Sequence, residues 1–174
     1  MPPTALSTAP SGISTGKAAR ARRIRRLYLA LVGAFLLLGL FNVFGSRTAT
    51  VGTTGGGYTM RLRYPQITRS SLPVQWQLLL THPGGFAGPV SVAVPIDYFN
   101  LFDFNNFYPT PDSTVNQGGL VVMTFPQPTG DTLDVLLDAR TQAGLRAGRH
   151  ATTAILDRQG RPLVQVRYRT LVLP

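Results

Sequence analysis

The stretch YTMRLRY (residues 58–64) decides the fold class of this chain. Apolar side chains occupy every second position, and polar or charged side chains fall between them. A period of two places the apolar residues on one face of an extended strand, whereas a helix would repeat every 3.6 residues. The same period returns in VQWQLLL (74–80) and in VSVAVPI (90–96). These segments are therefore predicted to be half-buried strands.

Four further strands are predicted along the rest of the chain. They lie at 120–125, 133–137, 150–157 and 163–173, and turns rich in Gly and Pro separate most of the strands. No amphipathic helical pattern follows residue 45. Short strands at such turn spacing predict an all-β fold, an Ig-like antiparallel β-sandwich of about seven strands over residues 58–174, with Trp76 in its core.

A long apolar segment, LYLALVGAFLLLGLFNVF, precedes this region and runs from Leu27 to Phe44. Eighteen helical residues extend about 27 Å, close to the ~30 Å thickness of a bilayer core. The segment has no polar stripe, so its surroundings should be apolar on every side. We therefore expect one N-terminal transmembrane helix over residues 27–45, whose partner is the lipid bilayer through Leu27 to Phe44.

The charges that flank this segment predict its orientation. Six Lys and Arg residues lie between Lys17 and Arg26, while only Arg47 follows closely on the other side. Basic residues stay on the cytoplasmic side, so the N-terminus should be cytoplasmic and the C-terminal domain extracytoplasmic. Residues 1–26 are predicted to be a disordered basic cytoplasmic segment, and residues 46–57 a flexible stalk. A cleaved signal peptide, which would release a secreted β-sandwich protein, is the alternative.

The C-terminal half carries a resemblance to a known family. It rests on FPQPTGDTLDV (125–135), on Ala143 to His150, and on TAILD (153–157) with Gly160. These turns and strands resemble the C-terminal half of bacterial Ig-like, adhesion-type domains. The layout as a whole resembles small actinobacterial single-pass membrane-anchored proteins of unknown function. Both resemblances imply a location and a fold, and neither implies a reaction.

The chemistry available to the chain is narrow. It has no Cys and no Glu, so thiolate nucleophiles, Cys-based metal sites and disulfides are excluded. His82 and His150 have no partner at a metal-ligand spacing, and no nucleophile elbow, zinc-protease or P-loop motif occurs. We expect no enzyme activity, no metal, no cofactor and no nucleic-acid partner. A surface hydrolase or ligand-binding enzyme that uses His82 or His150 is the alternative.

Two groups of residues are candidates for contact with partners. DYFNLFDFNNFYPTPD (97–112) concentrates aromatic residues; its rings either close an open end of the sandwich or form an apolar patch for a partner protein or the lipid interface. The spacing of its Asp and Asn residues does not match a calcium-binding EF-hand loop. The aromatic candidates are Tyr98, Phe99, Phe102, Phe104, Phe107 and Tyr108.

The second group consists of outward-pointing arginines on the first and last predicted strands, Arg61, Arg63, Arg167 and Arg169. If these strands are neighbours, four guanidinium groups share one face and could contact an anionic surface. The alternative is a solvated strand face that prevents sheet-to-sheet aggregation. The functional expectation is a membrane-anchored, non-enzymatic interaction or structural module of the cell envelope. Its expected partner is another envelope membrane protein or a wall polymer.

Overall fold

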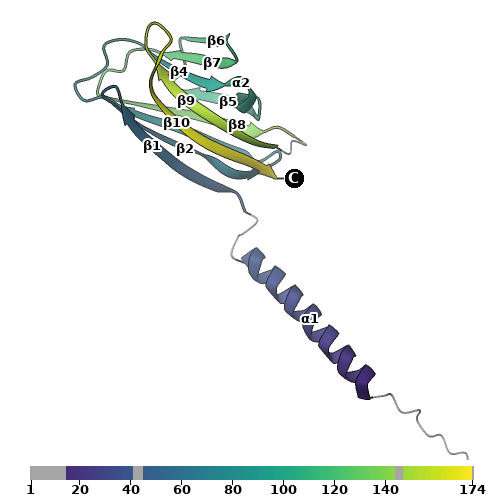
Figure 1. The fold of residues 1–174 in the computed structure, drawn as a ribbon. Helices are drawn as coiled ribbons and strands as arrows, with labels where there is room; N and C mark the ends of the chain where they lie inside the picture. The colour runs from purple at the N-terminus through teal and green to yellow at the C-terminus, as the bar shows by residue number, and fades with distance from the viewer. Residues whose placement is uncertain (1–14, 41–44, 144–146, 174) are drawn as a thin grey trace, which may run out of the picture. The chain divides into compact units, whose positions relative to one another are not determined.

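The computed structural model describes residues 15–40, 45–143 and 147–173, which fall into two units divided between Phe44 and Gly45. The first unit contains one long helix, and the second is built almost entirely of strands (Figure 1). The described elements are α1 (Thr15–Leu40), β1 (Arg47–Gly55), β2 (Tyr58–Arg69), β3 (Pro73–Thr81), β4 (Val90–Pro95), α2 (Ile96–Phe99), β5 (Phe102–Tyr108), β6 (Ser113–Gln117), β7 (Leu120–Phe125), β8 (Thr132–Thr141), β9 (Ala147–Leu156) and β10 (Pro162–Leu173).

The strands form one hydrogen-bonded path that folds over on itself. Its order is β5-β8-β3-β2-β10-β9-β4-β7-β6, and β1 pairs with β2 beside this path. β2 and β10 are joined by only three residue pairs, Ile67–Arg69 with Leu171–Leu173. These pairs are parallel, whereas the other strand pairs of the described residues are antiparallel, which corrects the expectation of a wholly antiparallel sheet. The inward faces of the two layers enclose the core of a β-sandwich (Figure 1).

All seven strands that were predicted from the sequence are present. Their observed bounds are those of β2, β3, β4, β7, β8, β9 and β10, several of them longer than predicted. The expected number of about seven is too low, since the described residues contain ten strands. The sequence prediction missed β1, β5 and β6, and each of these is a short or irregular strand outside the centre of a layer.

The predicted flexible stalk over residues 46–57 is wrong. Residues Arg47–Gly55 form β1, which pairs with β2 along its length, and the Gly-rich end is the turn between the two strands. Gly56 and Gly57 have φ angles of 58° and 82°, the left-handed conformation that tight hairpin turns require and that glycine adopts without strain. The β unit therefore begins near Gly45, thirteen residues before the predicted boundary at Tyr58.

The predicted disorder of residues 1–26 is wrong where the chain is described, because α1 begins at Thr15. The basic flank is rich in Ala and Arg, both strong helix formers, and a helix extends more easily than it nucleates. The rest of that prediction, and residues 41–44 of the predicted transmembrane segment, lie outside the described residues. Among the described residues, no helix meets the length and apolarity needed for a membrane span.

The centre of the sandwich contains a buried hydrogen-bond network around Tyr168 of β10. Trp76 of β3 donates its indole N–H to the Tyr168 hydroxyl over 3.3 Å, and the hydroxyl of Thr153 on β9 lies 2.8 Å from the same oxygen. All three side chains are buried. Trp76 is thus a core residue, as predicted, and its polar atom is paired across the two layers. Burial raises the pKa of Tyr168 to about 12.

Replacing Tyr168 by Phe should lower the free energy of unfolding by about 1–3 kcal/mol, because it leaves the indole N–H of Trp76 and the hydroxyl of Thr153 without this buried partner. Urea unfolding of the full chain in detergent measures the loss. Tyr64→Phe is the matched control, because Tyr64 is also buried and its ring packs against that of Tyr168, yet it is not a partner in the bonds of Tyr168 with Trp76 and Thr153.

The same pair of variants tests the raised pKa of Tyr168. The folded state holds the phenol proton more tightly than the unfolded state, so this stabilisation is complete below about pH 10 and is lost as the pH rises toward 12. Tyr168→Phe should therefore flatten the alkaline loss of stability. Equal destabilisation by Tyr168→Phe and Tyr64→Phe would contradict the role of the network.

Candidate functional site

The aromatic segment spans α2 and β5, and its first rings belong to the core. Tyr98 and Phe102 are only 2% and 6% exposed. The ring of Tyr98 lies 5.4 Å from that of Phe102 and 5.0 Å from that of Tyr168. The Tyr98 hydroxyl is 2.9 Å from the hydroxyl of Thr170, which itself donates to the carbonyl oxygen of Pro65. These two rings close the sandwich, as the first interpretation of the segment expected.

The remaining rings form a layered cluster toward the surface. Phe99, Phe104 and Phe107 are half-buried, and the ring centroids of Phe99 and Phe104 are 4.1 Å apart, with Phe107 lying 5.5 Å from Phe104. Tyr108, at the end of β5, is 73% exposed. The exposure of the rings therefore rises along the segment, from buried at Tyr98 to largely exposed at Tyr108, so both interpretations apply, each to different residues.

A small apolar cavity lies beneath this ring cluster. Its volume is about 10 Å³, close to the minimum needed for a single water molecule, and its lining exposes no polar surface. Trp76 and Leu137 form part of its wall together with Tyr98, Phe99 and Phe104. A cavity this small leaves no room for an organic ligand, so any contact made by this region takes place at its surface.

The four candidate arginines lie on neighbouring strands but in two separate pairs. Arg61 and Arg63 of β2 stand opposite Gly52 and Thr50, because β1 occupies the edge of β2 at this point. Arg167 and Arg169 of β10 stand opposite Thr152 and His150 of β9. The prediction that β2 and β10 are neighbours is confirmed over three residue pairs only. All four side chains are exposed, yet they do not form one row of guanidinium groups.

The two histidines have different surroundings. His150 is exposed on β9, beside Thr152, Arg167 and Arg169 in a shallow hollow. The His82 ring lies 4.3 Å from the ring of Tyr58, and its buried Nδ1 has no hydrogen-bond partner among the described residues. Within that part of the chain, no hydrogen bond joins either imidazole to an Asp, and no group of three metal-binding side chains occurs.

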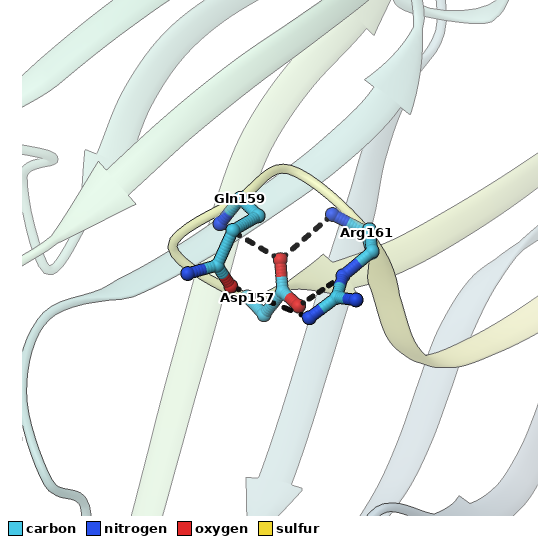
Figure 2. Close-up of polar contacts among 3 residues, drawn as sticks. All are labelled: Asp157, Gln159 and Arg161. Atoms are coloured by element: carbon cyan, nitrogen blue, oxygen red, sulfur yellow. Dashed lines mark hydrogen bonds and ion pairs between the residues drawn. The ribbon is translucent and has the colours of Figure 1, made fainter.

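A turn at the other end of the sandwich holds the one ion pair found in the described residues (Figure 2). The Asp157 carboxylate accepts hydrogen bonds from the backbone N–H groups of Gln159 and Arg161, and from Arg161 Nε at 2.9 Å. The hydrogen bond from the backbone N–H of Arg161 is the main reason why the pKa of the Asp157 carboxyl lies below its usual range. Gly160 closes the turn with a φ angle of 78°. These contacts fix the β9–β10 hairpin.

Asp157 also contributes to the wall of a hollow of about 260 Å³, with Tyr58, Phe86 and Arg158 among its neighbours. Both carboxylate oxygens are already bound within the turn, so the group is used for structure. Sequence reasoning identified this Asp-x-x-Gly turn but did not assign the carboxylate a partner. The sequence does contain a sign of this contact. The carboxylate of an Asp that begins a tight turn commonly accepts a hydrogen bond from the backbone N–H two residues ahead.

The comparisons with known proteins show likeness at the level of structure alone. No protein-family model matches the chain, and no curated protein matches it. One similar solved structure is the CARDB domain of a protein from Pyrococcus furiosus, solved with di-metal ions, with a TM-score of 0.39, 8% identity, and coverage of 73% of this chain and 93% of that chain. Another is a non-cellulosomal cohesin from Archaeoglobus fulgidus, with a TM-score of 0.35 and 11% sequence identity. That match covers 74% of this chain and 92% of the cohesin chain.

The Asp157 turn should make the stability of the β unit depend on acid pH. Because the folded state holds this carboxyl at a lowered pKa, its stabilisation is present above about pH 4 and is lost as the pH falls through the folded pKa. Asp157→Asn should lower stability at pH 7 and flatten the loss on acidification, as followed by thermal unfolding between pH 2 and 7. Asp112→Asn is the control, and the proposal of a structural carboxylate fails if both variants behave alike.

Proposed function

We propose that this protein is a membrane-anchored, non-enzymatic interaction module of the cell envelope, and that its β-sandwich binds another envelope protein at the β5 edge. The observation that carries this proposal is the exposure of Tyr108, 73% of whose surface is accessible at the end of a layered ring cluster. A large aromatic ring left in water has a hydrophobic cost that docking would remove.

The surroundings of Tyr108 favour recognition over chance exposure. The neighbouring rings of Phe104 and Phe107 are held against the core, so the surface near Tyr108 is preorganised and loses little conformational entropy on binding. Tyrosine supplies both an apolar ring and a hydroxyl, which is why it is enriched at protein interfaces. Asp103 and Asn106, both exposed on β5, supply polar groups at the rim of such a contact.

The membrane anchor in this proposal is the segment from Leu27 to Phe44, which extends four residues beyond the described helix α1. Along α1, the apolar side chains from Leu27 to Leu40 are largely exposed, including Leu29, Phe35 and Leu36. Such a surface on all sides of a helix is stable in lipid and unfavourable in water. The basic residues before Leu27 favour a cytoplasmic N-terminus and an extracytoplasmic β unit.

Single cysteines test this topology, because the natural chain contains none. A membrane-impermeant maleimide applied to intact spheroplasts should label Thr110→Cys, which lies in an exposed loop of the β unit, and should leave Thr4→Cys unlabelled until the cells are opened. The opposite labelling, or a full-length chain in the soluble fraction, would contradict the anchor. Loss of the residue-4 label from the mature protein would instead identify a cleaved, secreted domain.

Photo-crosslinking tests the interaction surface. We expect p-benzoylphenylalanine at position 108, introduced in growing cells, to yield one dominant protein adduct, because a docked partner would cover this ring. The same residue at Gln165, which is exposed on β10, is the matched control and should give no such adduct. Tyr108→Ala in a competing untagged chain should compete less well than the wild-type chain. Equal adducts from positions 108 and 165 would remove the support for this surface.

A further inference from the structure

The free edge of β6 lies at the opposite end of the strand order from β5. Among the strands that the structure describes, β6 pairs with β7 alone, and all five of its side chains are exposed. The outer edge of such a strand presents backbone N–H and C=O groups that can pair with another strand.

This edge lacks the features by which proteins usually prevent strand pairing. The sequence STVNQ (113–117) has no charge and no proline, and the β6–β7 ladder is regular. By contrast, β5 itself contains the charged Asp103 and a register irregularity between Phe104 and Asn106. Pro109 follows β5, and Pro111 and Asp112 precede β6, so the flanking residues do not distinguish the two edges. The absence of charge on β6 is notable in a chain whose net charge is +10.

The geometry points to a second copy of this chain as the occupant of the β6 edge: we propose a two-fold symmetric dimer in which β6 pairs antiparallel with β6 of the other copy, centred on Val115. In this register Val115 faces Val115, Ser113 faces Gln117, and Thr114 faces Asn116. Each pair is either apolar with apolar or polar with polar, and no like charges meet. A strand of five residues with Val at its centre is thus complementary to itself.

The outer surface beside β6 supports the same arrangement. Val115 is 53% exposed, and the strand register places it opposite Val122 of β7, which is half-buried. The residues aligned beyond Val122, Ala93 of β4 and Ala154 of β9, are buried, so the apolar outer surface is confined to the Val115–Val122 pair at the free edge. In the dimer the exposed side chain of Val115 gains an apolar cross-strand neighbour.

This proposal uses the backbone edge of β6, whereas the proposed function uses the side chain of Tyr108 on β5. Only residues 109–112 separate the two strands, so different variants, and not distance, distinguish the two contacts. Failure of the Tyr108 crosslinking experiment would leave it intact. Failure of the dimer would likewise leave the docking surface on β5 unaffected.

Cysteine crosslinking of the full chain in detergent tests the register directly. The symmetric pairing places the two Val115 Cβ atoms about 4.5–5.5 Å apart, close enough for a disulfide after small adjustment. Val115→Cys should therefore form an intermolecular disulfide rapidly under mild oxidation. Ser113→Cys is the matched control on the same strand, and its two copies would lie about 13 Å apart, four residues along the strand. It should crosslink at least tenfold more slowly.

A mixed experiment distinguishes the proposed register from other contacts between copies. Chains with Ser113→Cys should crosslink to chains with Gln117→Cys, because these positions face each other in the proposed dimer. Equal crosslinking rates for Val115→Cys and Ser113→Cys alone would overturn the register. Rapid crosslinking of Val115→Cys in cells to a different protein, with no adduct between copies, would identify another occupant and overturn the proposal.

A charge substitution provides a test without cysteine. Val115→Lys would place two ammonium groups opposite each other in the dimer, so sedimentation in detergent should show a dimer for the wild-type chain and a monomer for this variant. Its thermal unfolding should change little, because the side chain is exposed. Gln165→Lys adds the same charge to an exposed position of β10, which β9, β4 and β7 separate from β6, and should remain dimeric. A wild-type monomer, or a Val115→Lys dimer, would refute the proposal.

Discussion

The pairing of buried polar groups around Tyr168 is the constraint on which the sandwich depends. Its hydroxyl joins Trp76 of β3 to Thr153 of β9, so one oxygen connects the two layers through the middle of the core. An unpaired indole N–H or hydroxyl in that position would cost more than its bond contributes. The observed arrangement of the two layers pairs all three groups, and a shift of one layer against the other would separate Trp76 from Tyr168. The direct backbone link between the layers is short, just three parallel pairs between β2 and β10, which leaves their relative placement to side-chain packing.

The segment from Ile96 to Asp112 makes a second connection between the layers. It leaves β4, passes through α2 into β5 at the edge of the other layer, and then returns to β6. Tyr98 fixes its start, because Thr170 has a single hydroxyl proton that goes to the Pro65 carbonyl, so Tyr98 must donate to Thr170. The following rings stack outward from this fixed point. Because the segment passes from β4 in one layer to β5 at the edge of the other, its first rings are buried between the layers and its last ring, that of Tyr108, is exposed.

The sequence was informative wherever one face of a strand is buried. β2, β3 and β8 show a period of two because their alternate residues enter the core. β6 shows no such period, since all its side chains are exposed, and the irregularity in β5 breaks the alternation of its rings. The glycines of β1 suggest a stalk, but its Thr and Val residues favour a strand, and the pairing with β2 makes the strand the observed state. Its Gly-Gly turn was the missed signal.

The exposure gradient of the aromatic segment could not be predicted, because it depends on which layer each ring contacts.

The two free edges of the sheet have opposite properties, and this bears on how they can work together. The β5 edge is irregular and charged, so it suits recognition by side chains, whereas the β6 edge is regular and uncharged, so it suits pairing by backbone. Only residues 109–112 connect these two edges, so their separation in the strand order does not place them far apart in space. A dimer formed through β6 would carry two copies of Tyr108, and a partner that offers two binding sites would then bind with an avidity greater than either contact alone. A weak dimer forms mainly where the chains are already concentrated, because the fraction of chains in the dimer rises with their local concentration.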